Sequence, residues 1–137
     1  MLMTVEVKYT DTFSSDKVTW TKYAHHLRGL GVDESALKKL VDLGCSQVLR
    51  QAMLTASVGE RGLVPGAPAS GRVDKVMGVV LARGADQAAQ DVVTAVDAAV
   101  NIPVTFWPLK KFLDAAVAQP SLTEWANRMA NRYLRVD

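Results

Sequence analysis

The chain has 137 residues, of which 49% are hydrophobic and 22% charged, and this balance predicts one folded domain rather than a disordered chain. The net charge of +2 is too small to indicate a nucleic-acid ligand by itself. A single cysteine excludes an intrachain disulfide, and no apolar run approaches the roughly 18 residues that span a membrane. We therefore expect a soluble protein made inside a cell.

The N-terminal segment from Met3 to Phe13 alternates apolar and polar residues and is rich in β-branched side chains. This alternation predicts an extended arm or a short strand. Since no second strand is evident in the sequence, the arm is expected to lie on its own helices or along another molecule.

Two helices are expected next. The first is capped by Ser14 or Ser15 and runs to about Leu30, where glycines follow. The second is capped by Asp33 and continues to about Ala56. Together they predict a helix-turn-helix.

The segment from Gly59 to Gly71 contains four glycines and two prolines and predicts a loop. Beyond it, apolar residues at helical spacing predict helices over residues 72–83 and 86–101. A further helix is expected from Pro108 to Ala118. A capping box of Ser121 and Glu124 is expected to open the last helix, which reaches Leu134.

These elements predict an all-α fold, in which an N-terminal extended arm and a helix-turn-helix are followed by a compact C-terminal helical bundle. Residues 1–57 would form the arm and first helices, residues 58–71 the loop, and residues 72–137 the bundle, all within one structural unit.

The sequence offers little catalytic chemistry. The only histidines, His25 and His26, are adjacent on a helix and point about 100° apart, so they are poorly placed to share a metal ion. Cys45 falls on the apolar side of its predicted helix, where cysteine usually packs as a small hydrophobe. The glycine-rich stretches lack the Gly-Lys-Ser/Thr ending of a phosphate-binding loop. We therefore predict no enzyme, no catalytic residue, no metal site and no cofactor.

Positive charge is concentrated in the first two-thirds of the chain, with ten Lys and Arg against five Asp and Glu between residues 17 and 83. Such a surface suits sequence-independent contacts to phosphates. The residues predicted to bind DNA are Lys17, Thr21, Lys22, His25, His26, Arg28, Lys38, Lys39, Ser46, Arg50, Arg61 and Arg72.

Two stretches of the sequence resemble a known family. The segment from Leu109 to Phe112, the small residues after it, the run from Ala118 to Leu122, and Glu124 resemble coat proteins of rod-shaped and filamentous archaeal viruses, the rudiviruses, lipothrixviruses and tristromaviruses. A second similarity covers residues 30–32, Gly44 and residues 48–50.

The resemblance implies a structural protein of the virion, a capsid protein that wraps double-stranded DNA without reading its sequence and assembles into a helical filament. The DNA would be held in the A form by residues 15–56. Partners would be the DNA, copies of the chain itself and a paralogous coat protein, with no small-molecule substrate.

Two alternatives remain open at this point. The chain could be a small helical regulator that reads a defined DNA site with the helix from Asp33 to Ala56. It could also be a protein-interaction or inhibitor module that uses Phe106, Trp107 and the loop from Gly59 to Gly71. In the plainer interpretation the aromatic pair is a hydrophobic plug at a helix start.

Overall fold

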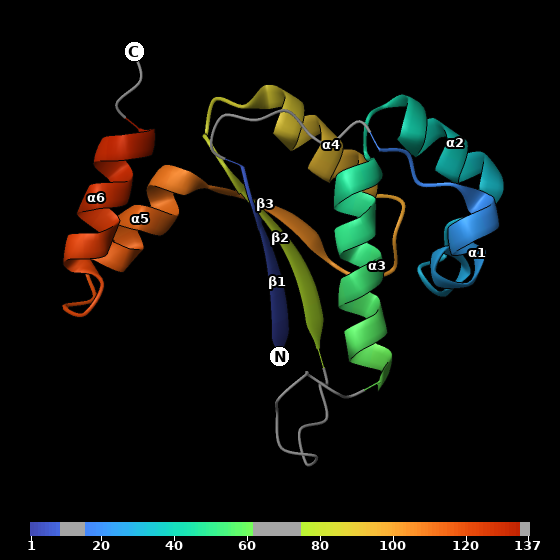
Figure 1. Ribbon diagram of the computed structural model, residues 1–137, viewed down its shortest axis with the longest axis horizontal. Coiled ribbons are helices and arrows are strands. Elements are labelled where there is room, and N and C mark those ends of the chain that lie inside the picture. The colour runs from blue at the N-terminus through green and yellow to red at the C-terminus, as the bar shows by residue number, and fades with distance from the viewer. Residues whose placement is uncertain (9–15, 62–74, 135–137) are drawn as a thin grey trace.

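The fold is α/β and not all-α: the computed structural model, which describes residues 1–8, 16–61 and 75–134, contains a three-stranded parallel sheet and six helices (Figure 1). The strands are β1 (Leu2–Val7), β2 (Val76–Ala82) and β3 (Val104–Pro108), in the order β1-β2-β3. The helices are α1 (Trp20–Gly29), α2 (Glu34–Asp42), α3 (Ser46–Arg61), α4 (Gln87–Asp97), α5 (Leu109–Val117) and α6 (Thr123–Tyr133).

The central strand β2 occupies a segment for which the sequence predicts a helix, and that prediction is wrong. Its sequence is Val-Met-Gly-Val-Val-Leu-Ala, and its last five residues are buried. A short, continuous apolar run fits a strand that is covered on both faces. Because every position in the run is apolar, residues at helical spacing are apolar whether the segment is a helix or a strand, and the spacing cannot distinguish the two. A parallel pair then needs a crossover, which α4 supplies between β2 and β3.

The N-terminal segment is a strand, as its alternation predicts, but its partner is neither a helix nor another molecule. β1 pairs with β2 along its whole length, from Leu2 opposite Val76 to Val7 opposite Leu81. The sequence analysis predicted no partner strand because residues 72–83, which contain β2, were expected to form a helix.

The predicted helix from Asp33 to Ala56 is two helices. Asp33 does cap α2, since its Oδ1 accepts a hydrogen bond from the amide of Ala36 at 2.8 Å. Gly44 then takes a left-handed conformation with φ of 76°, which ends α2 and turns the chain into α3. The single recognition helix of the regulator hypothesis is therefore absent.

The C-terminal helices agree only in part with the sequence prediction. Asp86 caps α4, and its Oδ1 accepts from the amide of Ala89. Residues 104–108 form β3, a strand that the sequence did not predict, and Pro108 ends this strand, so α5 begins at Leu109 and not at Pro108. The capping box before α6 does not form: the residue before the helix is Leu122, with no side-chain cap, and Glu124 pairs with Arg128.

Two hydrophobic clusters lie on opposite faces of the sheet. The larger joins α1 to α4 with one face through Val80, Val104 and Phe106. The smaller joins α5 and α6 with the other face through Leu81 and Trp107. Helices α1 to α4 therefore lie on one side of the strands and helices α5 and α6 on the other, as Figure 1 shows. In the described part of the chain, no helix is long and apolar enough to cross a membrane.

Candidate functional site

The carboxyl end of β1 carries polar side chains toward a helix. Alternation along the strand sends Thr4, Glu6 and Lys8 to the side of α3, while Val5 and Val7 face the other way and are 49% and 38% exposed. This arrangement inverts the usual one, in which apolar residues face the covering helix. An inward polar row of this kind needs partners on the helix.

Those partners come from one side of α3, where Gln47, Gln51 and Thr55 recur at every fourth position. Thr55 hydrogen bonds to the hydroxyl of Thr4. The Nε2 of Gln51 donates to the carbonyl of Thr4 and to that of Val79, both at 3.1 Å, and so ties α3 to two strands at once. The helix and strand are therefore held together by hydrogen bonds where apolar packing would be expected.

Gln47 connects the two charged residues of the row. Its Nε2 donates to Oε1 of Glu6, and its Oε1 accepts from Nζ of Lys8 at 3.2 Å. Because the amide has a donor side and an acceptor side, it satisfies the carboxylate and the ammonium separately and holds them apart. Lys8 is only 6% exposed, so its ammonium group is largely shielded from bulk water.

We call Glu6, Lys8 and Gln47 the β1 site. It lies at the carboxyl edge of a parallel sheet, which is where ligands bind in open α/β folds. The sequence prediction missed this site because it treated residues 3–13 as an arm without a sheet. The signal that could have found it is the acid–any residue–lysine spacing on an alternating strand, which places both charges on one face.

The residues predicted to bind DNA are placed on α1, α2, α3 and the segment before α1, but not at the β1 site. Ser46 is buried and its Oγ accepts from the amide of Val18, so it is part of the core. Arg50 donates to the carbonyl of Asp16 at 2.8 Å. The predicted site also includes Arg72, which lies outside the described residues, and Arg61, of whose side chain nothing is described. The exposed members are Lys17, Thr21, Lys22, His25, His26, Arg28, Lys38 and Lys39.

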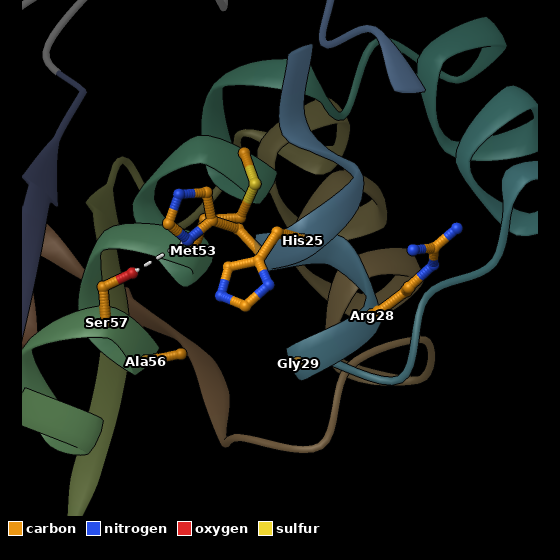
Figure 2. Close-up of a pocket in the computed structure, with 7 residues that line it drawn as sticks. His25, Arg28, Gly29, Met53, Ala56 and Ser57 are labelled. Carbon is orange, nitrogen blue, oxygen red and sulfur yellow. Dashed lines mark hydrogen bonds between the residues drawn. The ribbon is translucent and has the colours of Figure 1, made fainter. Parts of the chain in front are cut away.

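Three of these residues share a hollow between α1 and α3 (Figure 2). The hollow has a volume of about 320 Å³ and is lined by His25, His26 and Arg28 together with residues of α3. Nδ1 of His26 lies 3.3 Å from Oγ of Ser57, and the two histidine rings meet edge to face. Figure 2 shows the Arg28 guanidinium directed away from His25, and it stacks over the Trp20 ring at 5.3 Å.

Cys45 is buried in the larger cluster, as its apolar helical position predicts. Its Sγ lies 4.0 Å from the carbonyl of Val92, and burial raises the pKa of the thiol. The folded state therefore holds the thiol proton more tightly than the unfolded chain does. The resulting stability is fully present below the ordinary thiol pKa of about 8.5 and is lost as pH rises through the folded value.

Cys45→Ala is expected to remove this part of the pH dependence. Between about pH 8 and pH 10 the free energy of unfolding should fall more steeply for the wild type than for the variant, by up to about 1.4 kcal/mol per pH unit. Urea denaturation at each pH measures both slopes. Parallel slopes for the two proteins would show that the thiol does not titrate differently on unfolding.

Residues 1–135 match the family model described as "PD-(D/E)XK nuclease superfamily". Neither the comparison with curated proteins nor that with solved structures gives a match. The name of the family contains a motif, Asp or Glu, any residue, then Lys. Glu6-Val7-Lys8 is the only triplet of the sequence that fits it, and the Pro-Asp of the name does not occur.

This match overturns the coat-protein resemblance and what it implied. The similarity rested on helix starts and small-residue runs, which recur in unrelated helical segments, whereas the family model spans nearly the whole chain. The predictions of a capsid protein, of a filament around A-form DNA and of a chain without enzymatic activity are corrected with it. Nucleic acid remains the implied partner, now as a substrate. The chain belongs to the PD-(D/E)XK nuclease superfamily.

Proposed function

We propose that this protein hydrolyses phosphodiester bonds of nucleic acid at the β1 site. The observation that carries the proposal is that the one acid–any residue–lysine triplet of the chain lies at the carboxyl end of a parallel strand, with both charges bridged by Gln47. A carboxylate that can accept a proton and an ammonium that can stabilise charge on a phosphate are groups that a phosphoryl-transfer site uses.

The two charged side chains have different tasks in this proposal. The Lys8 ammonium binds a non-bridging phosphate oxygen and stabilises the negative charge that grows on it during attack. The Glu6 carboxylate accepts the proton of the attacking water as the new oxygen–phosphorus bond forms and the bond to the departing sugar oxygen breaks. Gln47 is a positioning residue that fixes the spacing of both.

A catalytic divalent cation is a common aid to such chemistry, and the described residues do not supply a complete site for one. Glu6 is the carboxylate of the β1 site, and its Oε1 already accepts from Gln47. Across residues 1–8, 16–61 and 75–134 there is no group of three or more His, Cys, Asp or Glu side chains that could hold a metal ion. The roles given to Glu6 and Lys8 therefore do not pass through a metal.

The proposal is tested by incubating the purified chain with end-labelled oligonucleotides and separating the products by gel electrophoresis. Duplex DNA is compared with single-stranded DNA and with RNA. Each substrate is tested with Mg²⁺, with Mn²⁺ and with EDTA. No cleavage of any substrate under all three conditions would contradict the proposed activity.

The exposed cations on α1, on α2 and in the segment just before α1 support a further part of the proposal, that they hold the nucleic acid through its phosphates. None of Lys17, Lys22 and Lys39 forms an ion pair in the part of the chain that the structure describes. Unpaired surface cations can each displace a counterion from a nucleic-acid backbone.

Replacing Lys17, Lys22 and Lys39 together by Ala is expected to weaken binding to all sequences alike and to reduce the salt dependence of binding. If each residue contacts one phosphate, the slope of log affinity against log salt should become shallower by about three. Fluorescence anisotropy at several salt concentrations measures it. An unchanged slope would remove these residues from the binding surface.

A further inference from the structure

The hollow between α1 and α3 is a recess whose walls carry hydrogen-bond donors (Figure 2). The rings of His25 and His26 come from α1, and the hydroxyl of Ser57 comes from α3. Met53, which is 5% exposed, and Ala56 supply an apolar part of the lining. The volume of about 320 Å³ is within the range of sites that hold a small ligand.

The contact between His26 and Ser57 leaves a donor for a ligand in either tautomer of the ring. Nδ1 of His26 lies 3.3 Å from Oγ of Ser57. If the hydroxyl donates to Nδ1, the ring proton is on Nε2, which can donate to another acceptor. If Nδ1 donates instead, the hydroxyl proton of Ser57 can be donated elsewhere. The ring of His25 adds a further N–H, with its centroid 5.5 Å from that of His26.

The charge around the hollow favours an anion. None of the described residues that line it is acidic, and α1 contains no Asp or Glu. Lys22 precedes His25 by three positions and His26 by four, so it lies on the same side of α1. The Arg28 guanidinium, stacked over Trp20, adds a permanent positive charge at the rim. Two such cations on one helix repel a metal ion and attract a negatively charged group.

We propose that this hollow binds a phosphate group of a nucleic-acid strand, with His25, His26 and Ser57 donating to the non-bridging oxygens of the phosphate. Hydroxyl and nitrogen donors of side chains are common ligands of nucleic-acid phosphates. Lys22 and Arg28 contribute the surrounding positive potential rather than direct contacts. The inference rests on the proposed function, because that function makes nucleic acid the ligand.

The hollow is separate from the β1 site. Ser57 follows Gln47 by ten positions on α3, which corresponds to about 15 Å along the helix. Gln47 contacts β1, whereas Ser57 contacts α1. Loss of a phosphate contact in the hollow should therefore weaken binding of the strand and leave the rate of the chemical step at the β1 site unchanged.

The first test adds a negative charge to the hollow. Binding of a 3′-fluorescein-labelled oligothymidylate is measured by anisotropy in the Glu6→Gln background and in EDTA, so that the strand is not cut. Ser57→Asp places a carboxylate beside the bound phosphate and should weaken binding at least tenfold, a change of about 1.4 kcal/mol or more. Gln119→Glu adds the same charge at an exposed position after α5, on the other side of the sheet, and should weaken binding less than about twofold.

The second test separates the lost donors from a structural effect. His26→Leu and Ser57→Ala each remove one donor and should weaken binding about threefold to tenfold. His26→Gln and Ser57→Thr keep a donor at the same place and should bind within about twofold of the parent. If the conservative variants lose as much affinity as His26→Leu and Ser57→Ala, the contact serves only to pack α1 on α3 and the proposal is overturned.

The phosphate can come from the end of a strand or from its interior, and the same titrations distinguish the two sources. Each variant is titrated with a strand that carries a 5′-phosphate and with a strand that lacks it. Losses confined to the phosphorylated strand assign a terminal phosphate to the hollow, whereas equal losses with both strands assign an internal one. A parent protein that binds neither strand, or hollow variants that bind both strands as the parent does, would overturn the proposal.

Cleavage and binding together distinguish this inference from the proposed function. If the wild type cuts oligonucleotides and Ser57→Asp binds like Gln119→Glu, the hollow is not a phosphate site and the activity stands. If no substrate is cut but Ser57→Asp binds far more weakly than Gln119→Glu, the hollow stands and the activity is wrong. Where both hold, His26→Leu with Glu6 intact should cleave at the wild-type rate under saturating single-turnover conditions.

Discussion

Replacing Glu6 by Gln is expected to lower the rate of phosphodiester cleavage by about 100-fold or more, the usual effect of losing a general base. The substitution keeps the shape of the side chain and leaves an oxygen that can accept from Gln47, so the contact between β1 and α3 persists. What it removes is the negative charge and the ability to take a proton from water. Single-turnover cleavage of a labelled strand measures the change.

The control for this variant is Glu34→Gln, which removes a carboxylate of the same kind from the exposed first turn of α2. Its cleavage rate should equal that of the wild type. Both proteins should keep the circular dichroism spectrum of the parent. A Glu6→Gln protein that cleaves within about threefold of the wild type would exclude Glu6 as the base, because a lost general base costs far more than that.

Replacing Lys8 by Met is expected to lower cleavage by a similar factor, about 100-fold, because one preorganised donor to the transition-state charge is lost. Met fills nearly the same space as the lysine stem and carries no charge into a position that is 6% exposed. We therefore expect the free energy of unfolding to change by no more than about 1 kcal/mol. The predicted loss of rate is thus separate from a loss of folded protein.

Two measurements decide this prediction. Urea denaturation reports the stability, and single-turnover cleavage with saturating protein reports the chemical step apart from binding. Lys110→Met, on the exposed side of α5, is the matched control and should cleave at the wild-type rate under these conditions. Normal cleavage by Lys8→Met would show that the buried ammonium serves only the packing of β1 against α3.

The helices of this fold were more accessible to sequence reasoning than its sheet. Asp33 caps a helix as predicted, because a cap is a local interaction between residues three positions apart. The run from Val76 to Ala82 could not be identified locally, since a fully buried strand and a buried helical turn have the same composition. Its partners lie far away in the sequence, at β1 and β3.

The same limit explains why the candidate site was missed. Glu6 and Lys8 become a pair only if residues 2–7 form a strand, and Gln47 joins them only because α3 crosses that strand. The charge pattern of α1 and α2 was visible in the sequence, but it identifies a surface rather than a reaction.

The pairing of β1 with β2 determines when the β1 site can form during synthesis of the chain. The strand that bears Glu6 and Lys8 is made first, yet the strand that holds it in place is completed only at Ala82. Contacts between residues so distant along the chain form slowly, because the entropy of closing a long loop is lost before the contacts stabilise the fold. During synthesis the nascent chain therefore carries Glu6 and Lys8 before the β1 site can form around them. The site can form only after more than half of the polypeptide has left the ribosome.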